Sequence, residues 1–197
     1  VKNEGQIAQY YVTDDHEPIV SRELWEVTQL EIKRRREFLK AHGLRTLGRF
    51  TDEQPFTSRV FCGVCGSPFW RRTCYRSYGA IKTWMCSTRY YEKGVKSCGN
   101  DTMKEEIFHA AFIEAWNFLL ANREQYVPMW GAQIKGDDLL AAFRAKQFLK
   151  LTKQARTMVE LDKSIVSKTF EKSIIYPMVE VEFYFLDGTV IEVDTIK

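Results

Sequence analysis

The sequence of 197 residues has no hydrophobic run long enough to cross a membrane and no segment typical of a secretion leader. A membrane-spanning helix needs about 20 predominantly apolar residues, and no stretch here approaches that length. A leader would start with a basic segment followed by an apolar stretch and a small-residue cleavage site. We therefore expect no membrane partner. Because the sequence begins at Val1 rather than Met, we also expect the chain to be a piece of a longer protein.

Motifs that carry catalytic chemistry are missing as well. The sequence has no glycine-rich phosphate loop, no HExxH helix and no nucleophile elbow. It has three histidines, His16, His42 and His109, and none stands at a spacing that pairs it with a cysteine or carboxylate as a catalytic set. We expect no catalytic residues in this chain.

The number of cysteines is odd. Five cysteines argue against a complete disulfide framework and favour a reducing compartment, although disulfide bonding stays an alternative. Cys74 lies in the middle of a predicted strand, away from the spacing of a metal ligand, and we interpret it as a small strand residue. The other four cysteines are the most informative feature of the sequence.

These four cysteines, Cys62, Cys65, Cys86 and Cys98, suffice for a closed tetrahedral zinc site. The motif CGVCG predicts a tight knuckle, and twenty residues between Cys65 and Cys86 fit a β-hairpin joining the halves of a zinc ribbon. Eleven residues separate Cys86 from Cys98 instead of two, so the second knuckle is opened into a loop. A redox pair of Cys62 and Cys65 is disfavoured because the strand-to-helix context of such motifs is absent.

Positive charge is concentrated in the cysteine-containing part of the chain. The net charge of the chain is +3, whereas residues 51–100 hold eight Lys and Arg against three Asp and Glu, a local net charge of +5. Such a concentration on a small β-structure indicates a surface for phosphates. The alternative is an ordinary solvated surface.

The pattern of residues predicts an α+β fold. Hydrophobic residues make up 45% of the chain, which is enough for a folded protein of one large or two small domains. From the N-terminus we expect a strand at 6–12, a Ser21-capped helix to about Lys40, a linker at 43–57, a hairpin of strands 67–75 and 81–85, helices at 103–120, 137–151 and 160–173, and a C-terminal β-hairpin turning at Asp187-Gly188.

The helix expected at 103–120 has the clearest apolar stripe, which predicts a core-facing helix. Asp101 or Thr102 is expected to cap its start. The residues of the stripe are Ile107, Ala111, Phe112, Ala115, Trp116 and Leu119.

Two stretches resemble large serine recombinases. YYVTDDHEPIVSRELWEVTQLEIKRR is similar to the end of their DNA-binding recombinase domain, and FTSRVFCGVCGSPFWRRTCYRSYGAIKTWMCSTRYYEKGVKSCGN resembles their zinc β-ribbon. In that family the ligands are a CxxC pair, a cysteine opening a CSxR-like segment and a last cysteine after a Lys/Gly-rich loop. The resemblance thus implies Zn²⁺ bound by Cys62, Cys65, Cys86 and Cys98.

The resemblance also implies a division into domains. Residues 1–42 would end the recombinase domain, residues 43–57 would be the linker, and residues 58–197 would form the zinc β-ribbon domain with flanking helices and the C-terminal hairpin. FLDGTVIEV resembles the strand pair at the family's C-terminus. No part matches the family's catalytic domain, and no heptad register of a long coiled-coil arm is found, so we expect the arm to be reduced or removed.

The function implied is that of the DNA-binding C-terminal portion of a site-specific serine recombinase. It would recognise double-stranded attachment-site DNA during integration or excision of a mobile element, together with other recombinase subunits, in the cytoplasm of a bacterial host cell. Candidate DNA contacts are Arg71, Arg72, Arg76, Arg89 and Lys93 in the ribbon and Arg34, Arg35, Arg45 and Arg49 before it. Strand alternation places Arg72 and Arg76 beside Trp70, and we favour that face.

The alternative function is a zinc ribbon that binds protein and not DNA. In that case the aromatic side chains of the ribbon would form the partner surface. They are Trp70, Tyr75, Tyr78 and Trp84.

Overall fold

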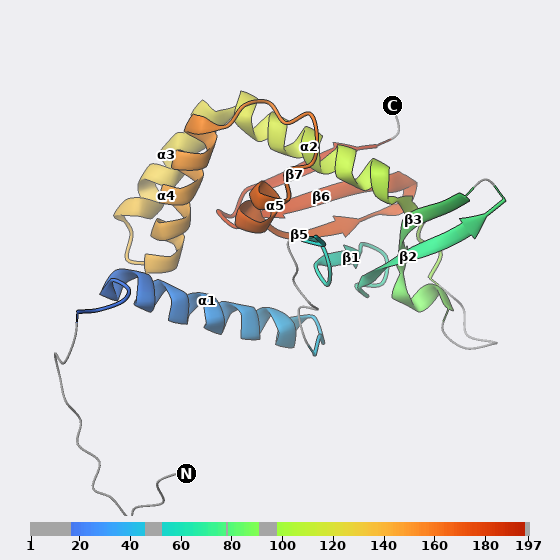
Figure 1. Cartoon of the computed structure of the whole chain (residues 1–197), viewed down its shortest axis with the longest axis horizontal. Helices are drawn as coiled ribbons and strands as arrows, with labels where there is room; N and C mark the ends of the chain where they lie inside the picture. The colour runs from blue at the N-terminus through green and yellow to red at the C-terminus, as the bar shows by residue number, and fades with distance from the viewer. Residues whose placement is uncertain (1–16, 46–52, 78, 91–97, 196–197) are drawn as a thin grey trace, which may run out of the picture.

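The computed structural model describes residues 17–45, 53–77, 79–90 and 98–195, which form a mixed α+β fold (Figure 1). The predicted fold class is therefore confirmed. The strand expected at 6–12 lies outside the described residues. No helix in the described ranges is long and apolar enough to cross a membrane.

One sheet joins the cysteine-containing segment to the C-terminal part of the chain. Its strand order is β1 (Val60–Cys62), β5 (Phe170–Ile175), β6 (Glu180–Phe185) and β7 (Val190–Asp194). The two short strands β1 and β5 pair in parallel, with Val60 opposite Ser173 and Cys62 opposite Ile175. β5, β6 and β7 pair antiparallel, which confirms the C-terminal hairpin.

The second sheet is the hairpin of the cysteine-containing segment. β2 (Phe69–Arg76) and β3 (Gly79–Cys86) pair antiparallel from Phe69 opposite Cys86 to Arg76 opposite Gly79. A two-residue strand, β4 (Met103–Lys104), adds to β3. The hairpin predicted from the alternating pattern is confirmed, and Figure 1 shows it extending away from the rest of the fold.

Helix α2 (Glu105–Ala121) covers the first sheet and carries the centre of the core. Phe108 and Phe112 are fully buried and lie against Phe183, with ring centroids 5.6 Å apart in each case. Phe56, at the end of the stretch read as a linker, is 2% exposed and packs edge-on against Phe108. The core thus begins before residue 58.

Two details of the prediction for α2 are wrong. Ile107 is 38% exposed and Phe108 takes its place in the core. The helix starts at Glu105, after β4, and neither Asp101 nor Thr102 caps it. The carboxylate of Asp101 instead accepts a hydrogen bond from the backbone N–H of Met178.

Helices α3 (Arg123–Lys135) and α4 (Leu139–Gln154) form a pair beyond α2. α3 was not predicted, since Pro128 lies inside it and proline removes a helical hydrogen bond. Its anchor is Trp130, fully buried, whose Nε1–H donates to Asp187 Oδ2 at 2.7 Å. The helix predicted at 160–173 is only α5 (Lys163–Thr169), because the chain enters β5 at Phe170.

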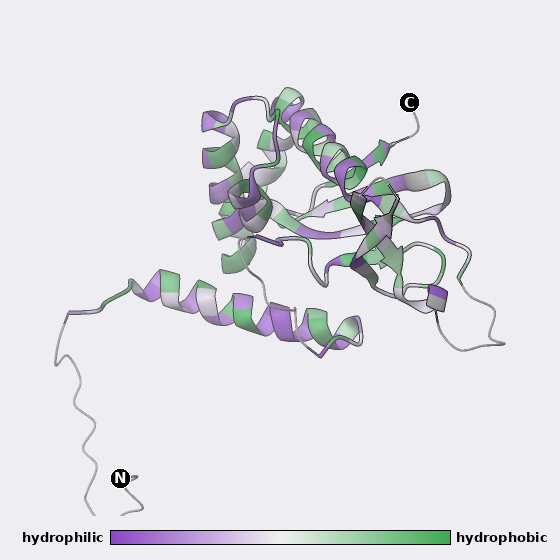
Figure 2. Cartoon of the chain, turned by 45° about the vertical axis from the view of Figure 1, so that its right-hand side comes forward, coloured by the Kyte–Doolittle hydropathy of each residue, from purple (hydrophilic) through white to green (hydrophobic). Residues whose placement is uncertain are grey.

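Helix α1 (Arg22–Ala41) has Ser21 as its N-cap, as predicted, and the Ser21 hydroxyl accepts from the N–H of Leu24. Val27 is the one residue of this helix that is buried. In Figure 2 the helix mixes hydrophilic and hydrophobic residues and lies beside the remaining elements. It contacts them through ion pairs of Glu31 and Arg34 and through the ring of Phe38, whose centroid lies 6.0 Å from that of Phe61 in β1.

Candidate metal centre and nucleic-acid surface

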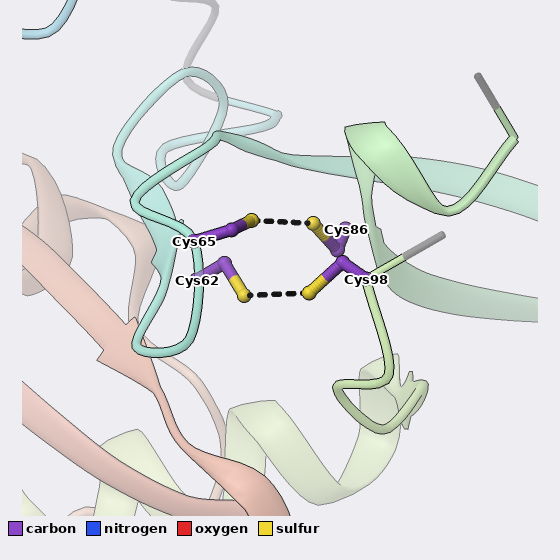
Figure 3. A group of neighbouring side chains, drawn as sticks. All are labelled: Cys62, Cys65, Cys86 and Cys98. Atoms are coloured by element: carbon purple, nitrogen blue, oxygen red, sulfur yellow. Dashed lines mark hydrogen bonds between the residues drawn. The ribbon is translucent and has the colours of Figure 1, made fainter. Parts of the chain in front are cut away.

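The four cysteines of the predicted zinc site converge. Their Sγ atoms all lie within 4.8 Å of one another. Two short separations join the CxxC knuckle to the later cysteines, 3.6 Å between Cys62 and Cys98 and 3.5 Å between Cys65 and Cys86 (Figure 3). Cys74 lies outside this cluster, with its Sγ 3.4 Å from Thr83 Oγ1.

The knuckle is formed by its own backbone. The N–H of Gly66 donates to the carbonyl of Cys62 at 2.8 Å, and the N–H of Cys62 donates to the carbonyl of Ser67 at 2.9 Å. Gly66 has a φ of +71°, a conformation that residues with a Cβ rarely adopt. A Cβ at Gly63 would lie 2.3 Å from the ring of Tyr176, so only glycine fits there too.

The cluster fits a four-coordinate metal ion. Metal–sulfur bonds of about 2.3 Å in a tetrahedron place the sulfurs about 3.8 Å apart, close to the separations of 3.6 Å for Cys62–Cys98 and 3.5 Å for Cys65–Cys86. Four thiolates leave no open position for a substrate or water, so such a site stabilises the fold and does not catalyse. The side-chain Nδ2 of Asn100 donates to Cys62 Sγ at 3.2 Å, a contact suited to a negatively charged sulfur.

The electrostatics of the cluster also favour a cation. Desolvation raises the pKa of Cys65, but hydrogen bonding, chiefly with the Thr88 hydroxyl, outweighs it and brings the pKa to about 6. Desolvation raises the pKa of Cys86 to about 12, and the neighbouring Cys65 adds to this rise. An ionised thiol at one cysteine thus disfavours ionisation of its neighbour. A divalent cation offsets this repulsion because its positive charge stabilises all four thiolates.

Several arginines proposed as DNA contacts have partners inside the fold. Arg71 forms an ion pair with Glu105, in which Nη2 donates to Oε1 at 2.9 Å. Desolvation raises the pKa of Glu105, but this pairing outweighs it and leaves the pKa below its usual value. Arg34 donates to Glu31 and Glu171.

Arg35 and Arg89 are also engaged but stay exposed. Arg35 donates to Glu31 at 2.7 Å, and Arg89 donates to the Asn100 carbonyl and the Thr102 hydroxyl. Arg45 is exposed near the end of the described N-terminal range. The side chain of Arg76 and all of Arg49, Tyr78 and Lys93 lie outside the described residues.

The opposite face of β2 presents a cation toward solvent. Arg72 is exposed, with its guanidinium 5.3 Å from the centre of the Trp70 ring, and Trp70 is 44% exposed. Arg72 lies opposite Thr83, and Thr83 lies opposite Lys104, so Arg72 and the exposed Lys104 share one face about 10 Å apart. We call these three residues, Trp70, Arg72 and Lys104, the hairpin face.

Sequence reasoning missed Lys104, because only the pairing of β3 with β4 places it beside Arg72. The aromatic surface expected for a protein-binding ribbon is incomplete. Trp84 is 2% exposed and packs on Phe108, whereas Trp70 and Tyr75 are exposed.

Comparisons with known proteins agree with this geometry. Residues 55–117 match the family described as the recombinase zinc beta ribbon domain. A search of the curated proteins finds no match. Among solved structures, one described as "Crystal Structure of a LSR-DNA Complex", where LSR stands for large serine recombinase, shares the fold with a TM-score of 0.50 and 15% sequence identity. The match covers 89% of this chain and 68% of that one.

The chain therefore contains a recombinase zinc β-ribbon domain. Beyond residues 55–117, the chain shares its overall fold with the protein of that complex. The resemblance inferred from the sequence is confirmed.

Proposed function

We propose that this chain is the DNA-binding C-terminal portion of a site-specific serine recombinase. It would recognise attachment-site DNA during integration or excision of a mobile element, beside other recombinase subunits. The observation that carries the proposal is the recombinase zinc β-ribbon at 55–117 within a fold seen in a large serine recombinase–DNA complex. Residues 1–42 are proposed as the end of the recombinase domain and 43–57 as the connection to the ribbon domain.

The metal is proposed to be zinc, held by Cys62, Cys65, Cys86 and Cys98 as a structural ion. Thiolates favour zinc over hard cations such as Mg²⁺ and Ca²⁺. The ion would tie the CGVCG knuckle to the end of β3 and to the start of the segment that leads into α2. It would thereby fix the base of the hairpin that carries the DNA-binding face.

The hairpin face is the proposed DNA contact. A two-stranded β-ribbon fits the major groove, which is about 12 Å wide. Arg72 is exposed and lies beside Trp70, so its guanidinium can reach a phosphate or a guanine edge. Lys104 on the same face supplies a second cation. Arg71 points the other way and is held by Glu105, which leaves it a structural role.

Arg72 and Arg71 are neighbours in sequence with different expected roles, so they provide a matched test. We expect Arg72→Ala to weaken binding to duplex DNA, by about 1–3 kcal/mol on the cognate site if Arg72 contacts a base. Arg71→Ala should lower the stability to urea while DNA affinity of the folded protein stays near that of the parent. Equal DNA affinity for the parent and both variants would refute the assignment.

A protein-binding ribbon is the second candidate, favoured by the exposure of Tyr75 at 84% and of Trp70. In that case both arginine variants would leave DNA affinity unchanged, and Tyr75→Ala would weaken binding to a protein partner. The same titrations therefore separate the two functions.

A further inference from the structure

Asn100 stands between the candidate metal centre and the C-terminal sheet. The residue is 1% exposed. Its Nδ2 donates to Cys62 Sγ at 3.2 Å and to the backbone carbonyl of Ile175, in β5, at 2.7 Å. Its Oδ1 accepts from the N–H of Asp101 at 2.9 Å. Every polar atom of this side chain is thus in use.

The knuckle and β5 are also joined directly. The N–H of Gly63 donates to the same Ile175 carbonyl at 2.9 Å, and Cys62 lies opposite Ile175 in the parallel pair. The ring of Tyr176 fills the space beside Gly63. One carbonyl therefore receives hydrogen bonds from the residue after a metal ligand and from Asn100.

The chemistry at this position requires an amide. The NH₂ group of asparagine has two hydrogens, one for the sulfur and one for the carbonyl. A carboxylate has no hydrogen to donate at neutral pH and would repel a thiolate, and a serine hydroxyl can donate to only one of the two acceptors. A hydrogen bond onto a metal-bound sulfur orients that ligand and adjusts its charge.

We propose that Asn100 is a positioning residue, which aims Cys62 at the metal and couples metal occupancy to the seating of β5 on the knuckle. This inference rests on the proposed metal site. It also reaches beyond residues 55–117, because the partner strand β5 comes from residues 170–175. Metal loss should therefore loosen the β1–β5 junction before it loosens α4.

The first experiment compares Asn100→Ala with Asn117→Ala. Asn117 is a matched control, since its side chain also bridges backbone groups, donating to the Met158 carbonyl at 2.9 Å and accepting from the Met158 N–H at 2.8 Å, and it is no part of the metal cluster. Zinc transfer to a chromogenic chelator is expected to become about 10–100-fold more favourable in Asn100→Ala. It should stay at the parent value in Asn117→Ala.

A spectroscopic measurement separates positioning from general stability. In the cobalt-loaded proteins, loss of the hydrogen bond to Cys62 should shift the thiolate-to-cobalt charge-transfer band in Asn100→Ala and leave it unchanged in Asn117→Ala. If the parent protein binds zinc and Asn100→Ala keeps the parental zinc affinity and spectrum, the inference is overturned and the proposed function stays intact. A parent protein that binds no zinc would instead refute the proposed metal site.

The parent alone supplies a second test, which does not depend on any variant folding. Amide hydrogen exchange is followed while zinc is withdrawn by a chelator. We expect the Gly63 amide and the β5 amides to lose protection before the amides of α4. Unchanged protection of Gly63, or simultaneous loss of protection throughout α4, would contradict the proposed coupling.

Discussion

Glu31 offers the sharpest test of how α1 is held against the other elements. Its carboxylate accepts from Arg34 at 3.0 Å and Arg35 at 2.7 Å on its own helix, and from Arg144 of α4 at 2.5 Å. Arg34 extends the network to Glu171 of β5 at 2.7 Å. Since α1 buries only Val27, we expect this network to provide much of its docking.

The shift in the pKa of Glu31 gives the size of the expected loss of unfolding free energy. Desolvation raises that pKa, but the hydrogen bonds and charges of Arg34, Arg35 and Arg144 outweigh it and lower the pKa from 4.5 to about 2. A pKa difference of one corresponds to about 1.4 kcal/mol, so the full shift corresponds to about 3 kcal/mol. The side chain is 23% exposed and glutamine keeps part of the hydrogen bonding, so we expect Glu31→Gln to cost about 1–3 kcal/mol of unfolding free energy.

The pH dependence has a defined sign. Because the folded-state pKa lies below the unfolded one, the ionised carboxylate stabilises the fold above about pH 5, and this stabilisation is lost as the pH falls toward 2. The gap between parent and Glu31→Gln should therefore shrink to about half or less by about pH 3. Acid effects on the cysteines are common to both proteins and cancel in the comparison.

The assay is urea unfolding of both proteins between neutral pH and about pH 3, with Glu23→Gln as the control. Glu23 lies on the same helix and also pairs with α4, through Lys146 at 3.3 Å, but its side chain is 63% exposed. Exposed pairs of this kind contribute about 1 kcal/mol or less. If Glu31→Gln costs no more than Glu23→Gln, or if its cost does not fall in acid, the ionic docking of α1 is refuted.

Two further predictions concern the metal and the core. Cys74→Ser should keep one zinc ion per chain by metal analysis, whereas Cys65→Ser should lose most of it; metal loss in the Cys74 variant would contradict the ligand assignment. Phe108→Ala should cost about 3–5 kcal/mol in urea unfolding because it opens a cavity beneath α2, while Ile107→Ala should cost less than about 1 kcal/mol. A larger loss in Ile107→Ala than in Phe108→Ala would show that Ile107, and not Phe108, is the core residue.

Local signals in the sequence were enough to predict much of the fold. The Ser21 cap, the alternation of β2 and β3 and the turn at Asp187-Gly188 each act over a few residues, and each of these elements is confirmed. The spacing of the cysteines, read with the family resemblance, indicated which four would cluster.

Contacts between distant segments could not be predicted. The parallel pairing of Val60–Cys62 with Ser173–Ile175 joins short strands from the two halves of the chain. The sequence of either strand does not identify the other as its partner. The ion pair of Arg71 with Glu105 has the same origin. Strand alternation placed Arg71 and Arg72 on opposite faces and favoured the face of Arg72, but it could not show that α2 packs against the other face and supplies Glu105 as the partner of Arg71.

Helix α3 shows a second limit of prediction from sequence, because its tertiary contacts outweigh its local preference. Pro128 and Gly131 argue locally against a helix, but the hydrogen bond from buried Trp130 to Asp187 holds it in place. Burial of one large side chain therefore outweighs the local preference. In the same way, the helical pattern of residues 160–173 yields to β5 because Phe170 joins the core beside Phe112 and Phe183.

The central claim is that this chain binds duplex DNA through the hairpin face. The most direct measurement is the affinity of the parent protein for an attachment-site duplex and a scrambled duplex at several salt concentrations. We predict that the logarithm of the binding constant falls linearly with the logarithm of the salt concentration, and that removing a phosphate contact in Lys104→Ala reduces the slope by about one. Absence of binding to either duplex, or an affinity independent of salt, would contradict the account.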